Sequence, residues 1–274
     1  MTPILCFDLE TIPDAGGLRK LDMFEASLDD AAGVAAVQAA RLASHGSDFL
    51  PHYLQRVWVV GCAFRDADGF RVRCLGDQHG ASDADESARI RLFFKTIEKH
   101  TPQLVSWNGG GFDLPVLHHR ALIHGISAPR YWDQGDDDRD FKWNNYLSRY
   151  HARHLDLMDV VSGYQNRAFA PLDGLARLCG FAGKLGEDGS KVWSSFLEGR
   201  GESVRAYCET DVVNTYLLFC RFRLVRGEWT EAQYGAELAV VRDALQAMIG
   251  DSASPLSGAH WQKYLQAAPA LHVL

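Results

Sequence analysis

The chain has 274 residues, of which 47% are hydrophobic and 23% are charged, a composition typical of a globular protein with a substantial core. The length fits one large α/β domain or two small ones, and we favour a single domain over residues 1–274. The formal net charge of −7 excludes a basic protein that coats nucleic acid. It does not exclude nucleic acid as a substrate, because bound cations can neutralise a site locally.

Six cysteines are present, and none forms a C-x-x-C pair or accompanies histidines at zinc-finger spacing. We therefore interpret them as buried, reduced thiols. Asp8 and Glu10 interrupt the first apolar stretch, and no basic segment precedes it, so no signal peptide is predicted. No apolar run has the length of a membrane span. These features predict a cytoplasmic protein without a membrane partner.

The first half of the chain predicts a sheet. Apolar and β-branched runs predict strands at residues 3–11, 56–64, 70–75 and 103–107, with a hairpin turn at 66–69. Amphipathic spacing predicts helices at 83–99 and 113–125. Residues 14–50 are helical in places, end at Pro51, and are interpreted as a helical insertion between two strands.

The second half predicts mainly helices. These are expected at residues 172–179, 202–224 and 231–248, the last within a helical C-terminal extension from about residue 228. Residues 133–149 and the Gly-rich stretch 183–191 are expected to be loops, whereas 154–161 is a short apolar element of ambiguous type. The order of elements indicates an α/β fold, a mixed sheet with helices packed on it.

Two acids, Asp8 and Glu10, lie two residues apart on the first predicted strand. Period-two geometry puts both side chains on one face. Burying two carboxylates side by side is unfavourable unless cations or hydrogen-bond donors compensate. The pair therefore indicates a metal site, although the same spacing also fits acids in water just beyond a strand end.

Two further features suggest polar chemistry. Asp113 follows a strand and a Gly-rich turn at residues 108–111, where it fits the N-cap of a helix with Pro115 in its first turn. Tyr207 and Asp211 are four residues apart on a predicted helix and share a face. Taken alone, Asp113 is a plain cap, Tyr207 a core residue and Asp211 a surface acid.

In this order the three features read D-x-E, N-x-x-x-F-D and Y-x-x-x-D. The chain resembles the DEDDy-type 3′–5′ exonucleases of the ribonuclease H-like superfamily, above all stand-alone bacterial proteins related to the proofreading exonuclease of family B DNA polymerases. The residues that carry the resemblance are 7–11 (FDLET), 106–115 (SWNGGGFDLP) and 207–211 (YCETD), with similar stretches at 154–157 (HLDL) and 183–189 (GKLGEDG).

The resemblance implies a ribonuclease H-like sheet and a site that holds two divalent cations, Mg²⁺ or Mn²⁺, through four acids. Asp8 would bridge both ions, Glu10 and Asp211 would complete the tighter site, and Asp113 would hold the second ion through water. Carboxylates suit such hard cations, which stabilise the attacking and leaving oxygens of a phosphodiester. Tyr207 would orient the attacking water, since a phenol with a pKa of about 10 is a poor base at neutral pH.

The same resemblance implies contacts to the substrate. Leu9 and Thr11 would touch the terminal nucleotide, and Asn108 and Phe112 its sugar and base, with Phe112 as a stacking surface. Lys184, and with it Lys191, would bind phosphate. The alternatives are a core role for Phe112 and ordinary solvated lysines. Asp156 is either a further acid near the site or a structural hydrogen-bond acceptor.

The expected function is removal of nucleoside 5′-monophosphates from the 3′ end of single-stranded nucleic acid, DNA rather than RNA. The protein would act alone in repair, or in trans with a DNA polymerase or repair complex. Three alternatives stay open: a catalytically inactive protein that binds 3′ ends, an exonuclease directed to RNA, and an α/β protein whose acids are only caps and surface charges. The complete set of five motif residues argues against the inactive protein, because loss of activity usually leaves an acid missing, and the third alternative requires the three motifs to coincide by accident.

Overall fold

The structure is a computed structural model, and it describes residues 2–76, 80–186, 188–250 and 258–272. A five-stranded mixed sheet has the order β3-β2-β1-β4-β5. Its strands are β1 (Ile4–Pro13), β2 (Gln55–Asp66), β3 (Gly69–Cys74), β4 (Gln103–Ser106) and β5 (His154–Asp156). β1 lies at the centre, antiparallel to β2 along its whole length and parallel to β4 at its start. β3 and β5 form the two edges.

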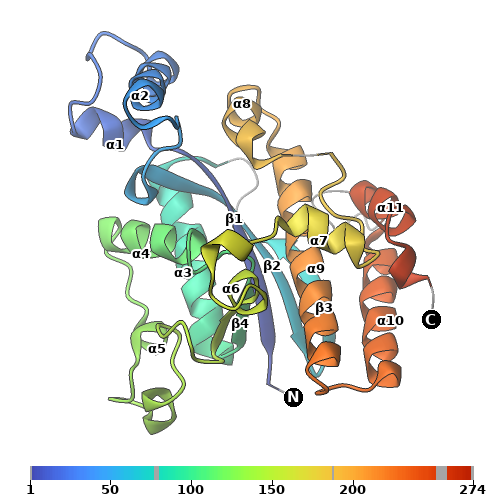
Figure 1. Ribbon diagram of the computed structural model, residues 1–274. Helices are drawn as coiled ribbons and strands as arrows, with labels where there is room; N and C mark the ends of the chain where they lie inside the picture. The colour runs from blue at the N-terminus through green and yellow to red at the C-terminus, as the bar shows by residue number, and fades with distance from the viewer. Residues whose placement is uncertain (1, 77–79, 187, 251–257, 273–274) are drawn as a thin grey trace.

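Helices cover both faces of the sheet. Those between β1 and β5 are α1 (Ala15–Lys20), α2 (Asp30–His45), α3 (Asp83–His100), α4 (Asp113–Ile123) and α5 (Pro129–Trp132). Those after β5 are α6 (Leu157–Val161), α7 (Leu172–Leu178), α8 (Val192–Leu197), α9 (Gly201–Val225), α10 (Glu231–Met248) and α11 (Ala259–Gln266). Figure 1 shows α3 and α4 on one side of the sheet and α9 and α10 on the other. None of the helices in the described ranges is long and apolar enough to cross a bilayer.

The alternation of side chains along β1 divides the core in two. Ile4 and Cys6 pack with α9, α10 and α11, whereas Leu5, Phe7 and Leu9 pack with α3 and α4. Because successive side chains of a strand point to opposite faces, the next even-numbered residues continue on the α9 side. The two acids of the first motif therefore face α9.

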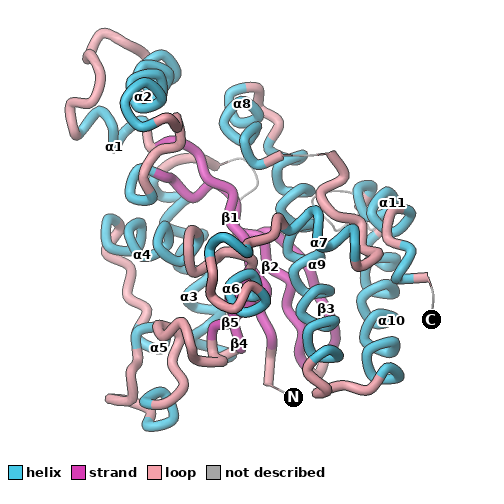
Figure 2. The backbone as a smooth tube through the Cα atoms, in the orientation of Figure 1, coloured by secondary structure: helices cyan, strands magenta, loops and turns pink. Residues whose placement is uncertain are grey.

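The segment between β1 and β2 forms a small unit with its own apolar centre. Figure 2 shows α1 and α2 at one end of the sheet. The buried residues of the segment are Leu18, Val34, Val37, Leu50 and Leu54. Asp14 caps α1 by accepting a hydrogen bond from the backbone N–H of Gly17 at 3.0 Å.

Arg120 of α4 connects this segment to the rest of the fold. Its guanidinium donates to Asp14 at 2.5 Å and to Glu86 of α3 at 2.8 Å. Glu86 has no exposed surface and also accepts a hydrogen bond from the backbone N–H of Val57 at 2.7 Å. The start of the α1–α2 segment is thus held to α3 and α4 by a buried network of charged groups.

The predicted elements correspond closely to the observed ones. The α/β fold, a mixed sheet flanked by helices, is confirmed. The ambiguous stretch 154–161 splits into β5 and α6, and residues 133–149 hold only a 3-10 turn at Arg139–Lys142. The helices α5, α8 and α11 were not separately predicted. Of the expected loop at 183–191, Glu187 lies outside the described residues.

Candidate functional site

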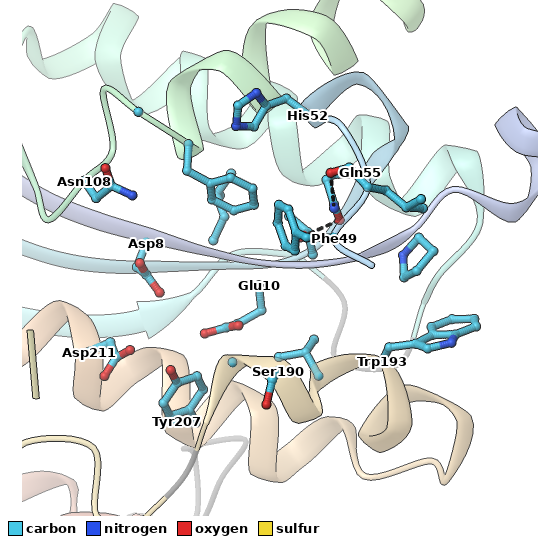
Figure 3. Close-up of a pocket in the computed structure, with 18 of the residues that line it drawn as sticks. Asp8, Glu10, Phe49, His52, Gln55, Asn108, Ser190, Trp193, Tyr207 and Asp211 are labelled. Carbon is cyan, nitrogen blue, oxygen red and sulfur yellow. Dashed lines mark hydrogen bonds between the residues drawn. The ribbon is translucent and has the colours of Figure 1, made fainter. Parts of the chain in front are cut away.

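Asp8 and Glu10 lie side by side on the face of β1 that meets α9, as period two predicts (Figure 3). Glu10 is only 5% exposed, so this acid lies within the fold and not beyond the strand end. Asp8, Glu10 and Cys208 each offer one possible ligand atom, and these three atoms lie within 4.8 Å of one another. The first motif therefore places its two carboxylates together at the α9 interface.

Helix α9 approaches β1 closely enough to complete this cluster. Gly61 of β2 is the partner of Asp8, and a Cβ on it would lie 2.6 Å from the sulfur of Cys208. The missing side chain lets α9 lie against the sheet at this point. Tyr207 and Asp211, one helical turn apart, are both buried and both face the acids of β1 (Figure 3).

Lys184 brings a positive charge into the cluster. Its Nζ lies 3.0 Å from Oδ2 of Asp211, and it donates a hydrogen bond to the hydroxyl of Tyr207. Burial lowers the pKa of Lys184, but the charges of Asp211, Asp8 and Glu10 outweigh burial and raise it overall. The lysine is therefore charged and partly balances the acids.

The acids are in an environment that disfavours their charged forms. Burial, followed by the charges of Asp113 and Asp211, raises the pKa of Asp8 well above its ordinary range. Burial and then the charges of Asp8 and Asp211 do the same for the pKa of Glu10. Burial also raises the pKa of Asp211, against the lowering effect of Lys184. One lysine does not compensate for this cluster of carboxylates.

The donor set fits divalent cations. Oδ1 of Asp211 is buried and has no hydrogen-bond partner within the described part of the chain. A buried oxygen without a partner is unfavourable unless something else satisfies it. Carboxylate oxygens are the ligands that Mg²⁺ and Mn²⁺ prefer, so Asp8, Glu10 and Asp211 could hold such an ion.

Asp113 lies differently from its predicted place. The prediction that it caps α4 is wrong: Phe112 is the N-cap residue, without a side-chain cap, and Asp113 is the first residue of the helix. Its Oδ1 instead accepts a hydrogen bond from the backbone N–H of Leu9 at 2.8 Å. Burial raises its pKa to about 7, although that hydrogen bond lowers it. Asp113 thus lies beside β1 at Leu9, where its charge raises the pKa of Asp8.

The turn before α4 is held by Asp156. Asn108 has a φ of 67°, a left-handed conformation that asparagine tolerates better than most residues. The carboxylate of Asp156 accepts hydrogen bonds from the backbone N–H groups of Asn108 and Gly110, both at 2.9 Å. Asp156 therefore has a structural role, because its carboxylate holds the turn that carries Asn108.

Two cavities meet at the acids. One of about 600 Å³ is lined by Asp8, Glu10, Tyr207 and Asp211 together with every predicted substrate-contact residue except Lys191: Leu9, Thr11, Asn108, Phe112 and Lys184. A second, of about 1080 Å³, shares Asp8, Asn108, Lys184 and Asp211 and also contains Lys191. Asp113 lines neither. A strand that crosses the acid cluster would therefore have space on both sides of it.

Several residues of the smaller cavity were not predicted. Phe49, His52 and Gln55 come from the end of the α1–α2 segment and the start of β2, and Ser190 and Trp193 come from the opposite wall (Figure 3). These positions follow no periodic pattern and belong to no motif. Among them, only Phe49 carried a sequence signal, its aromatic character.

Comparisons with known proteins identify relatives of this chain. Residues 47–268 match the family model described as a predicted 3′-5′ exonuclease related to the exonuclease domain of PolB. The matched range includes Asn108, Asp113, Lys184, Tyr207 and Asp211 but begins after Asp8 and Glu10.

A DNA polymerase of Archaeoglobus fulgidus is 25% identical over 150 residues, which are 54% of this chain and 19% of that protein. The structure of the family B DNA polymerase of Pyrobaculum calidifontis aligns with 95% of this chain and 27% of its own, at 18% identity and a TM-score of 0.48. The chain thus spans about a fifth to a quarter of these polymerases. By the match over most of its length, the chain belongs to the family of predicted 3′–5′ exonucleases related to the exonuclease domain of PolB.

Proposed function

We propose that this protein is a DEDDy-type, two-metal-ion 3′–5′ exonuclease that releases nucleoside 5′-monophosphates from the 3′ end of single-stranded nucleic acid. The observation that carries the proposal is the meeting of Asp8, Glu10, Tyr207 and Asp211 in one cavity, with a buried oxygen of Asp211 left without a partner in the described residues. Membership of the exonuclease family supports the reaction class.

Asp8, Glu10 and Asp211 would hold the tighter cation, with Asp8 shared by the second. Asp113 would act on the second ion through water, since its carboxylate is engaged by the N–H of Leu9. When bound, two divalent cations stabilise the charge that develops on the attacking and leaving oxygens. Their charge also offsets the repulsion among the acids, which one lysine offsets only in part.

Tyr207 would position the attacking water. Burial, followed by the charges of Asp211 and Glu10, raises the pKa of its phenol, so the hydroxyl keeps its proton at neutral pH. A neutral hydroxyl can orient a water by hydrogen bonding but cannot accept its proton readily. Lys184 lies beside this hydroxyl and is 28% exposed, so it can also contact a phosphate of the strand.

We propose DNA over RNA as the substrate. The matched family is related to a polymerase exonuclease domain, and a relative of the chain is a DNA polymerase. The smaller cavity has the volume of a small-molecule site, which suits one unpaired nucleotide. Discrimination between the sugars depends on contacts to the 2′-OH.

We propose one domain, with residues 14–50 as an insertion and a helical extension from about residue 228. The enzyme would work in the cytoplasm, alone in repair or in trans with a DNA polymerase or repair complex.

The test uses purified protein and a 5′-labelled single-stranded DNA oligonucleotide, with Mg²⁺, with Mn²⁺ and with chelator. We expect a ladder that shortens from the 3′ end only with metal, and an Asp8→Asn variant that leaves the strand intact. The same assay on RNA measures the sugar preference. The exposed acid Asp137 gives a matched control, Asp137→Asn, which should shorten the strand like the wild type.

Two outcomes would change the assignment. If neither DNA nor RNA is shortened under any metal but the protein binds 3′ ends, it is an inactive end-binding protein. If metal affects neither binding nor thermal stability, the acids are structural charges and the proposal is wrong.

A further inference from the structure

Phe49 lines the smaller cavity with an aromatic ring that is half exposed. Its side chain is 52% exposed although it lines the same cavity as Glu10 and Tyr207. Its ring lies 5.6 Å from that of Phe112, tilted by 55°, and the Phe112 ring lies 5.5 Å from that of His52. Figure 3 shows Phe49 on the side of β1 opposite Tyr207 and Ser190.

Packing does not account for the position of this ring. Among the described residues, Phe49 belongs to none of the four hydrophobic clusters, whereas its neighbour Leu50 is 2% exposed within the α1–α2 core. A large ring left half in solvent inside a polar cavity is available to a ligand with an apolar face.

The backbone at Phe49 is anchored on both sides. Arg41 donates from Nε to the carbonyl oxygen of Phe49 at 2.5 Å, and Gln55 donates from Nε2 to that of Leu50 at 3.0 Å. Gln55 in turn accepts from the hydroxyl of Thr11 at 3.0 Å. Through Thr11, the loop is fixed to the strand that carries Asp8 and Glu10.

The ring is therefore held at a set place relative to the acids. We propose that Phe49, with Phe112, forms the stacking surface for the base of the 3′-terminal nucleotide, so that the α1–α2 segment sets how tightly a strand end is bound. This inference rests on the proposed function. A nucleobase is the part of a strand with a flat aromatic face, and stacking on aromatic side chains tolerates every base.

The experiment compares wild type with Phe49→Ala, Phe49→Tyr and Leu42→Ala. Leu42 lies on α2, is 53% exposed, and does not line the cavity, so it is matched to Phe49 in exposure. For shortening of single-stranded DNA, we expect Phe49→Ala to raise KM by roughly 5- to 100-fold and to change kcat by less than about threefold. Phe49→Tyr keeps the ring and should behave like the wild type, as should Leu42→Ala.

A second readout does not need turnover. Oligonucleotides carry 2-aminopurine either at the 3′ terminus or at the 5′ terminus, and Ca²⁺ replaces Mg²⁺ so that the strand stays intact. The wild type and Phe49→Tyr should quench the 3′-terminal fluorophore and leave the 5′-terminal one unchanged. Phe49→Ala should lose the quenching.

The results separate this inference from the proposed function. If the wild type shortens DNA and Phe49→Ala has the same KM as Leu42→Ala, the exonuclease stands and the stacking surface is wrong. A fall in kcat with an unchanged KM would also overturn it, because that pattern indicates a distorted metal site. If no strand is shortened but quenching depends on Phe49, the proposed function fails and the stacking surface stands. Absence of both effects overturns both.

Discussion

Lys184 and Asp211 form an ion pair of 3.0 Å between a loop residue that is 28% exposed and a helix residue that is 3% exposed. The lysine is thus the internal cation of the acid cluster, and it reaches the cluster from a segment separate from both β1 and α9. Its charge competes with any metal ion for the same carboxylate, because the lysine pairs with Oδ2 and the free oxygen is Oδ1. Metal binding and lysine pairing are therefore opposed at Asp211.

Replacing Lys184 should separate metal affinity from turnover. Lys184→Met removes the competing charge, so we expect roughly tenfold tighter Mn²⁺ binding. Loss of the phosphate contact should lower kcat roughly 10- to 100-fold. Calorimetric titration with Mn²⁺ and the oligonucleotide assay measure the two effects. Lys191→Met, in the same loop, is the control, and weaker Mn²⁺ binding by Lys184→Met would show that the lysine organises the acids.

Replacing Tyr207 should affect turnover alone. Tyr207→Phe keeps the ring and removes only the hydroxyl, so kcat should fall about 100-fold through loss of water positioning. The increase in melting temperature caused by Mn²⁺ should persist, since the carboxylates are unchanged. Thermal melts with and without Mn²⁺, beside the oligonucleotide assay, test this. An unchanged kcat would remove Tyr207 from the mechanism.

The raised pKa of Asp113 predicts a pH-dependent stability of the metal-free protein. Burial raises that pKa from an ordinary 3.8 to about 7. Between those values the folded protein binds the proton and the unfolded chain does not, so the free energy of unfolding falls as pH rises. The fall amounts to at most about 4 kcal/mol. It should be absent in Asp113→Asn, whose amide oxygen can still accept from the N–H of Leu9.

Urea unfolding from pH 4 to pH 8 in chelator measures this difference between variant and wild type. Taking the difference removes the contribution of other titrating groups, among them His154, whose pKa burial lowers to about 4. Asp137→Asn is the matched control in an exposed loop. Parallel pH dependences of Asp113→Asn and the wild type would show that Asp113 is ionised in the fold throughout this range.

The Arg120 network should contribute strongly to stability. Arg120→Met leaves Glu86 and Asp14 buried without their main partner, so the free energy of unfolding should fall by about 3–5 kcal/mol. Arg226 is 54% exposed in its ion pair with Glu228, and Arg226→Met should cost less than about 1 kcal/mol. Urea midpoints measure both. Equal midpoints would mean that water or rearrangement replaces Arg120.

Local pattern was sufficient to predict most of the fold and part of the site. The alternation of side chains along β1 alone predicted that Asp8 and Glu10 share one face of the strand. The helical spacing of Tyr207 and Asp211 predicted that these two residues share one face of α9. The N-cap at Asp113 was predicted wrongly because a Phe-Asp-Leu-Pro sequence looks like a cap, whereas the hydrogen-bond partner of its carboxylate, Leu9, is 104 residues away. Such a partner is set by tertiary packing and leaves no local signal.

The wall that carries Phe49 was missed for a different reason. The position of Phe49 in the cavity depends on how the α1–α2 segment packs at the end of the sheet. Neither the periodicity of the sequence nor its capping residues encode that contact. The aromatic character of the residue was visible, but its direction was not.

The central position of β1 has a consequence for how this molecule can diverge. Its residues, Asp8 and Glu10 among them, pair with β2 along the whole strand, so the amide protons bonded to β2 should exchange with solvent only on global unfolding. The α1–α2 segment has a separate small core and should exchange earlier. Mutations that accumulate in that segment can therefore alter which strand ends are accepted while the acids keep their arrangement, so that specificity and chemistry can evolve at different rates.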